Sequence, residues 1–212
     1  MGNLFELTAL FIVLTDFMLL ASSRIASCIR TVALQGFALG LLLAASNLEG
    51  PGYHELLLMA ASVGLKGIAF PVMLTHTLAR LNVKREVEPY LGYPASIMMG
   101  IGALVFSFWV GSKLPAIAVS GFAVPVAFST MLTGFLLIIS RRKALTQVIG
   151  YLTAENGIFM FGVLAARAQS LWVDLAVMLD VLVAVFVMGI AIHNINAEFE
   201  STDVDRFDSL TD

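Results

Sequence analysis

The stretch SRRKALTQVIGYLTAENGIFMFG, residues 140–162, decides the fold class of this chain. Three bases precede an apolar helix, and a carboxylate, Glu155, lies at the middle of that helix. A charged side chain at bilayer depth is costly, so it is kept when it pairs with another charge, lines a water path or carries protons. We therefore interpret the rest of the chain as the surroundings of Glu155 and of its nearest equivalents, Lys66 and Asp180.

The composition places the chain among integral membrane proteins. Of its 212 residues, 59% are hydrophobic and 13% are charged, and the mean hydropathy is +0.92. No run combines bases with aromatic residues, which excludes a nucleic-acid footprint. Cys28 is the single cysteine, so an internal disulfide and a cysteine-rich iron–sulfur site are excluded. Phosphate-binding, dinucleotide and nucleophile motifs are absent and no two histidines have metal-ligand spacing, so we predict no catalytic centre, cofactor or metal in this chain.

Apolar runs predict an all-α bundle of about seven transmembrane helices. The predicted spans lie near residues 4–21, 30–47, 55–76, 94–112, 117–139, 145–167 and 171–192. Residues 1–193 would form the membrane domain and residues 194–212 an acidic cytoplasmic tail. The N-terminal run lacks a basic flank and a cleavage site, so we expect it to remain as a helix rather than to be removed as a signal peptide.

The loops differ in their content of lysine and arginine. By the positive-inside rule this difference predicts an N-terminus outside the cytoplasm and a C-terminus within it. One side carries Arg24, Arg30, Arg80, Lys84, Arg85, Arg141, Arg142 and Lys143, and the other carries Lys113 and Arg167.

Two prolines fall inside predicted helices. Pro71 and Pro125 each free a carbonyl four residues back and permit a kink. For Pro71 this carbonyl belongs to Gly67, beside Lys66. A broken helix beside a buried charge is common along ion paths, but most prolines in membrane helices are only bends, and the sequence leaves both interpretations open.

The chain contains a faint internal similarity. Residues 22–37 resemble residues 140–157, because in each a basic loop precedes an apolar helix that carries a polar residue, Gln35 or Glu155. We predict two parallel three-helix repeats, residues 1–76 and 117–193. An odd number of helices reverses the direction of the chain, so residues 94–112 would be the spacer helix that restores it.

Three ionisable residues are predicted to share one level. Lys66, Glu155 and Asp180 each lie about midway along a predicted span, counted at about 1.5 Å per residue. They are interpreted either as stations of a proton or sodium path or as neutralised pairs that only fix the helix register. Two acids and one base leave one acid without a countercharge, which requires a protonated carboxyl or a partner subunit.

Other polar residues complete the candidate path. Gln35 and Asn156 lie within the same helices, and Tyr151 lies one turn from Glu155, where its hydroxyl could donate a hydrogen bond. The weaker candidates are Asp16, interpreted first as a helix-end acid, and His76 and His193, interpreted first as residues of the membrane surface. Met98 and Met99 are expected to face lipid or to pack against neighbours.

The motif residues resemble a known family. RRKALTQVIGYLTAENG and AVMLDVLVAVFVM (residues 176–188) look like the K-type subunit of respiratory complex I and the C-type subunit of multisubunit cation/proton antiporters. With GLKGIAFPVML (residues 64–74) and the seven-span layout included, the chain is more similar to hydrogenase-4 component E. That protein is a membrane subunit of formate hydrogenlyase and related group 4 hydrogenase complexes.

The resemblance implies roles for particular residues. Asp180 matches the acid in the third helix of the small subunits, and Asn156 matches their asparagine. Their glutamate would align near Leu152, about one turn from Glu155. Component E itself resembles this chain in carrying an acid at Glu155 and a lysine at Lys66.

The resemblance also implies a function. The chain would be a non-catalytic membrane-arm subunit of a complex I-like oxidoreductase in a bacterial or archaeal cytoplasmic membrane, and its charges would take part in proton or sodium translocation coupled to electron transfer. Antiporter-like membrane subunits and a peripheral redox arm would be its partners, with iron–sulfur clusters and nickel–iron in those partners. The alternatives are a subunit of a cation/proton antiporter without redox partners, a stand-alone transporter with a substrate site at Lys66, and a scaffold.

Overall fold

A computed structural model describes residues 2–46, 60, 63–80, 89–113 and 122–165 of the chain, and within them the fold is all-α. A π-helical segment directly precedes one of the α-helices. The elements are α1 (Gly2–Ala21), α2 (Ile25–Ser46), η1 (the π-helix Val63–Ala69), α4 (Phe70–Arg80), α5 (Tyr93–Gly111), α6 (Ala123–Ser140) and α7 (Ala144–Ala165).

Most of the predicted spans correspond to these helices. Among the described residues, α5 and α6 have the length and apolar composition of membrane-crossing helices. The helix α2 begins at Ile25 rather than near residue 30, so Arg30 lies within the helix, where its side chain is exposed. A long cation near a helix end can extend its charged group to a membrane surface. The seventh predicted span and the acidic tail lie outside the described residues, so the count of seven stays a prediction.

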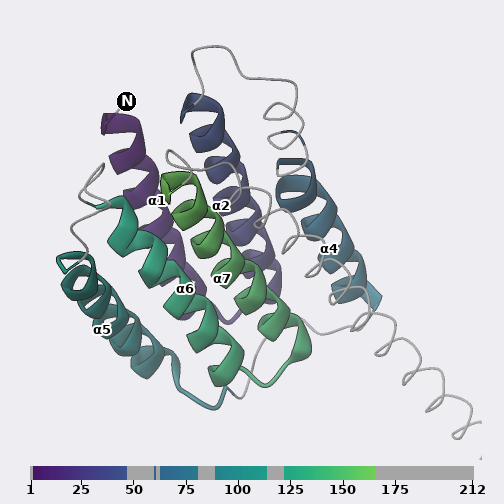
Figure 1. Cartoon of the computed structure of the whole chain (residues 1–212). Coiled ribbons are helices and arrows are strands. Elements are labelled where there is room, and N and C mark those ends of the chain that lie inside the picture. The colour runs from purple at the N-terminus through teal and green to yellow at the C-terminus, as the bar shows by residue number, and fades with distance from the viewer. Residues whose placement is uncertain (1, 47–59, 61–62, 81–88, 114–121, 166–212) are drawn as a thin grey trace, which may run out of the picture.

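The helices lie side by side as a bundle (Figure 1). The pair α6 and α7 has the most extensive contact, while α1 packs on α6 and α2 packs on α7. The segments η1 and α4 pack against α2 on one flank, and α5 packs against α6 and α1 on the other. This arrangement places α7, with Glu155, between α6 and the helices of the lysine-bearing flank.

Glycines bring α6 and α7 into close contact. A Cβ on Gly157 would lie 2.6 Å from the Met131 nitrogen, and one on Gly150 would lie 2.8 Å from the Gly134 oxygen. A Cβ on Gly134 would overlap the backbone of Ala154. Small residues at such spacing let two membrane helices approach closely. Since Gly150, Ala154 and Gly157 face α6, Glu155 and Asn156 are left to face other helices.

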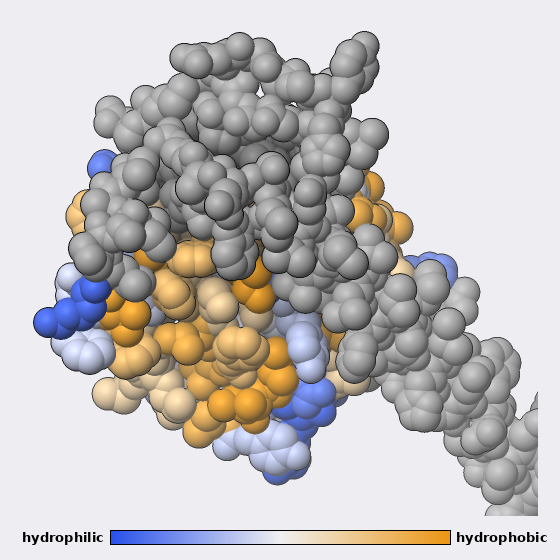
Figure 2. Space-filling view, in the orientation of Figure 1, coloured by the Kyte–Doolittle hydropathy of each residue, from blue (hydrophilic) through white to orange (hydrophobic). Residues whose placement is uncertain are grey.

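The surface of the bundle is apolar. On α5 the residues buried against the bundle are Ser96, Gly100 and Ser107, whereas its large apolar side chains point outward. Figure 2 shows the visible described surface as a nearly continuous hydrophobic area, with hydrophilic residues at its edges. An apolar surface of this extent is typical of contact with lipid. The exposed large side chains of α5 include Met98, Met99, Ile101, Val105, Phe106 and Trp109.

The two intrahelical prolines have different outcomes. At Pro71 the predicted irregularity is present, because the π-helix η1 gives way to α4 one residue before it. At Pro125 the predicted kink is wrong, since α6 begins at Ala123 and Pro125 lies in its first turn. The first N–H groups of a helix have no intrahelical acceptor, so proline is tolerated there without bending the helix.

Candidate functional site

A buried ion pair joins η1 to α7. Lys66 Nζ lies 2.9 Å from Glu155 Oε1, and each side chain is 3% exposed. Removing two opposite charges from water costs several kcal/mol per ion, which their attraction offsets only in good geometry. The pair therefore lies where a charge is expensive, and the Glu155 side chain points into the bundle.

The surroundings of Lys66 hold it toward α7. On the α2 side, a Cβ at Gly36 would lie 2.7 Å from the Lys66 Cβ, so glycine is required for η1 to approach α2 this closely. On the α7 side, Lys66 Nζ lies 4.5 Å from the centre of the Phe159 ring, in a cation–π contact. A π-helical turn at the lysine is itself notable, because single π turns occur frequently at functional sites.

The carboxylate of Glu155 has a countercharge but lacks hydrogen bonds from the described residues. Its contact with Lys66 has the distance of an ion pair but lacks hydrogen-bond geometry, and Oε2 accepts no hydrogen bond from the described residues. A buried carboxylate oxygen without a donor is costly. Such an oxygen can accept a hydrogen bond from a water molecule or bind a proton.

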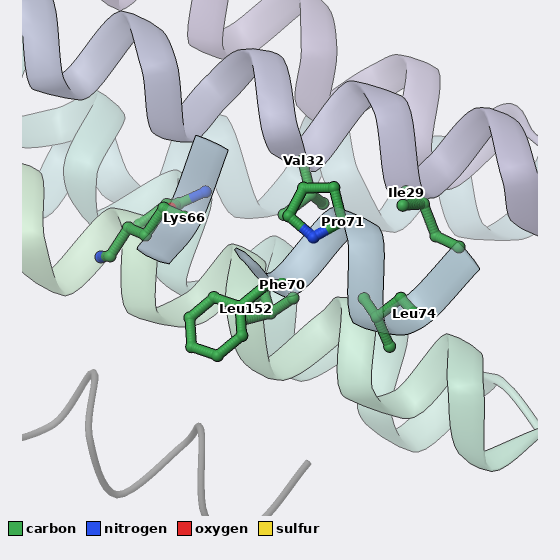
Figure 3. A pocket seen from close by; sticks show the side chains of 8 residues that line it. Ile29, Val32, Lys66, Phe70, Pro71, Leu74 and Leu152 are labelled. Atoms are coloured by element: carbon green, nitrogen blue, oxygen red, sulfur yellow. The ribbon is translucent and has the colours of Figure 1, made fainter. Parts of the chain in front are cut away.

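A small pocket is lined by Lys66 of this ion pair. Figure 3 shows Lys66 at one end of it and Ile29 and Leu74 at the other. The volume open to the centre of a water molecule is about 10 Å³, close to what one water requires. Its polar side chains are Lys66 and Asn156, while the rest of the lining is apolar and comes from α2, α4 and α7, namely Ile29, Val32, Phe70, Pro71, Leu74 and Leu152.

A second buried carboxylate, Asp16, lies in α1. It is 3% exposed and accepts two hydrogen bonds, from Gln35 Nε2 to Oδ1 at 2.8 Å and from the Thr130 hydroxyl to Oδ2 at 2.8 Å. The same Gln35 nitrogen donates to Thr15 Oγ1 at 2.9 Å. The interpretation of Asp16 as a helix-end acid is wrong, because side chains of α2 and α6 enclose it.

Asn156 extends the hydrogen bonds around Asp16 to α7. Its Nδ2 donates a long hydrogen bond, 3.4 Å, to Gln35 Oε1, and it follows Glu155 directly in α7. Gln35 thus donates to Asp16 and accepts from Asn156. A buried hydrogen-bond network thus joins polar residues of α1, α2, α6 and α7, and the Lys66–Glu155 ion pair is a second buried polar group of the bundle.

A further buried charge, Arg141, fixes the end of the bundle where α6 meets α7. Its side chain is 1% exposed. Nη2 donates to the carbonyl oxygen of Leu20 at 2.8 Å, in the last turn of α1, and the guanidinium lies 4.5 Å from the centre of the Tyr93 ring. A cation at a helix C-terminus satisfies carbonyls that have no intrahelical donor. Arg141, predicted as a loop residue, therefore ties α1 and α5 to the α6–α7 turn.

The remaining predicted residues lie apart from this group. Tyr151 is 40% exposed, and its hydroxyl is not a hydrogen-bond partner of the Glu155 carboxylate. His76 is exposed near the end of α4. Asp180 and His193 lie outside the described residues. Thr15 and Thr130 were missed, because an isolated threonine in an apolar helix carries no pattern that distinguishes it from a packing residue.

Comparisons with known proteins find relatives at low identity. The chain is 26% identical over 209 residues to an uncharacterized protein of Mycobacterium tuberculosis, covering 95% of this chain and 93% of that protein. It is 29% identical over 163 residues to hydrogenase-4 component E of Escherichia coli K12, covering 74% of each chain, and equally to that of Shigella flexneri. No family model and no solved structure matches. The chain is thus a helical membrane protein with distant similarity to hydrogenase-4 component E.

Proposed function

We propose that the chain is a non-catalytic membrane subunit of a hydrogenase complex related to complex I, in which the buried Lys66–Glu155 pair takes part in moving protons or sodium ions during electron transfer. The observation that carries the proposal is the ion pair itself, at 2.9 Å with each side chain 3% exposed. An intramembrane ionisable residue that faces the bundle interior is by default a functional group.

Three features support a mobile role rather than a purely structural one. The lysine lies in a π-helical segment, Oε2 of Glu155 lacks a hydrogen-bond donor among the described residues, and a pocket of about one water volume is lined by Lys66. A static ion pair is stabilised by full hydrogen bonding of both partners. The arrangement around Glu155 instead leaves a position for a proton or a water.

The similarity to hydrogenase-4 component E supports the choice of complex. The partners would be antiporter-like membrane subunits and a peripheral redox arm that holds the iron–sulfur and nickel–iron centres. Gln35 and Asn156 would belong to the same path, with Asp180 as a further station. The chain would lie in a bacterial or archaeal cytoplasmic membrane, with its basic loops on the cytoplasmic side.

The test compares Glu155→Gln with Glu6→Gln, which changes an exposed glutamate of α1 in the same way. Glutamine keeps the shape of glutamate and its amide oxygen is an acceptor beside Lys66, so we expect assembly to survive while the charge is lost. In membrane vesicles oxidising formate, Glu155→Gln should retain hydrogen evolution but lose most of the accompanying ion gradient, whereas Glu6→Gln should retain both. Full coupling in Glu155→Gln would contradict the proposal.

Copurification in mild detergent distinguishes the nearest rival. A nickel–iron or iron–sulfur protein in the purified complex supports the hydrogenase assignment. A complex of antiporter-like subunits alone, with ion exchange intact, would assign the chain to a cation/proton antiporter. Ion transport by the isolated chain in liposomes would instead identify a stand-alone transporter.

A further inference from the structure

Asp16 is held without an opposite charge. Its two oxygens accept from an amide and a hydroxyl, both neutral, and in the described part of the chain it forms no ion pair. The helix α6 contains no ionisable residue. An isolated carboxylate in an apolar interior is costly unless it is neutralised. The other titratable groups on α1 and on the elements around it are Glu6, Cys28, Arg30, Lys66, Tyr93, Arg141, Tyr151 and Glu155.

The hydroxyl of Thr130 can serve two charge states of Asp16. Thr130 Oγ1 lies 2.8 Å from Asp16 Oδ2 and 3.0 Å from the carbonyl oxygen of Val126. A hydroxyl has one proton and two lone pairs. When Asp16 is ionised, Thr130 donates to Oδ2. When a proton is bound to Oδ2, that O–H donates to Thr130 Oγ1, and the Thr130 proton turns to Val126.

We propose that Asp16 is a proton-binding carboxyl, with Thr130 as the hydroxyl that satisfies it in both its ionised and its protonated form. The proton binds at Oδ2, and Thr130 changes from donor to acceptor at that oxygen. Gln35 donates to Oδ1 in either state, and its own oxygen accepts from Asn156, the residue that follows Glu155 in α7. Proton binding at Asp16 stands alone, but a place for it in ion translocation rests on the proposed function.

The hydrogen-bond directions favour a proton over a monovalent cation. Oδ1 and Thr15 Oγ1 both face the donor nitrogen of Gln35. A cation coordinated by these oxygens would lie against the N–H groups of that amide, which carry partial positive charge. A proton on Oδ2 leaves every contact around Gln35 unchanged.

Infrared spectroscopy of the full-length chain in lipid vesicles tests the proposal as the pH is raised. We expect the carbonyl band of a protonated carboxylic acid to disappear reversibly. The Asp16→Asn variant should lack that component, and Glu6→Gln should keep it. In Thr130→Val the band should shift to higher frequency, because its hydrogen-bond partner is lost, while Thr130→Ser should keep the wild-type position.

Two results would overturn the proposal. The first is a wild-type spectrum in which no band of a protonated carboxylic acid is lost in Asp16→Asn or shifted in Thr130→Val. The second is a component that is lost on replacing potassium by sodium at constant pH, which would assign the site to a cation. The Thr130 variants retain Asp16, so they decide the matter even if Asp16→Asn does not fold. Because no transport is measured, the result is separate from the fate of the proposed function.

Discussion

The two buried carboxylates of this bundle are stabilised in opposite ways. Glu155 has a cation at 2.9 Å but an oxygen that accepts no hydrogen bond from the described residues. Asp16 accepts a hydrogen bond at each oxygen but has no cation beside it among those residues. The first site is balanced in charge and incomplete in hydrogen bonding, and the second is the reverse.

This contrast shows that charge balance and hydrogen-bond satisfaction are separate requirements for a buried acid. A missing countercharge is met by a proton, whereas a missing donor is met by a water molecule or a moving group. Each carboxylate therefore lacks something that a mobile species can supply. The contrast predicts how much each substitution at the two sites lowers the free energy of unfolding.

The largest effect is expected when one partner of the ion pair is removed. Lys66→Met leaves Glu155 as an uncompensated buried charge, and Glu155→Leu leaves Lys66 without its carboxylate. Each variant should lower the free energy of unfolding by about 3–5 kcal/mol. The double variant should recover most of that loss, because two apolar side chains need no partner. Reversible unfolding in detergent, arranged as a double-mutant cycle, measures the difference.

Additive losses in that cycle would contradict the ion pair as the main interaction of both residues. The exposed Glu6→Leu change provides the control for a glutamate substitution on the surface, and it should leave stability nearly unchanged.

A smaller effect is expected at the hydroxyl that serves Asp16. Thr130→Val is close in shape but removes the donor to Oδ2, so it should lower the free energy of unfolding by about 1–3 kcal/mol. Thr130→Ser keeps the hydroxyl and loses one methyl, so it should lose less. The same unfolding measurement compares them, and equal losses in the two variants would mean that packing, not hydrogen bonding, is the role of Thr130.

The smallest effect is expected for Asp16→Asn. The amide can accept from Gln35 with its oxygen and donate to Thr130 with its nitrogen, while Thr130 donates to Val126. We expect a loss of about 1 kcal/mol or less. If this variant were as unstable as Lys66→Met, Asp16 would need its negative charge in the folded state, and the contrast between the two acids would fail.

Much of the ion-pair site could be predicted from the sequence. Lys66 and Glu155 are isolated charges within apolar runs, and the cost of a charge in lipid requires them to face the interior. Their contact could not be predicted, because helix packing is decided by small residues such as Gly36 and Gly157, whose partners lie on other helices.

Most of the Asp16 site could not be predicted from the sequence. Asp16 lies near the end of an apolar run, and a shift of a few residues in the boundary separates a surface acid from a buried one. Tyr151 shows the opposite error. Its spacing from Glu155 suggested a common face, but a step of four residues still rotates by about 40°, and this was enough to leave the ring partly exposed.

The glycine contacts described above also have a mechanical consequence. They join interior helices in two units, α6 with α7 through Gly134 and Gly157, and α2 with η1 through Gly36. Gln35 and Lys66 belong to the second unit, whereas Asn156 and Glu155 belong to the first. Lys66–Glu155 and Asn156–Gln35 are therefore polar links between the two units. A displacement of one unit relative to the other would strain both links at once.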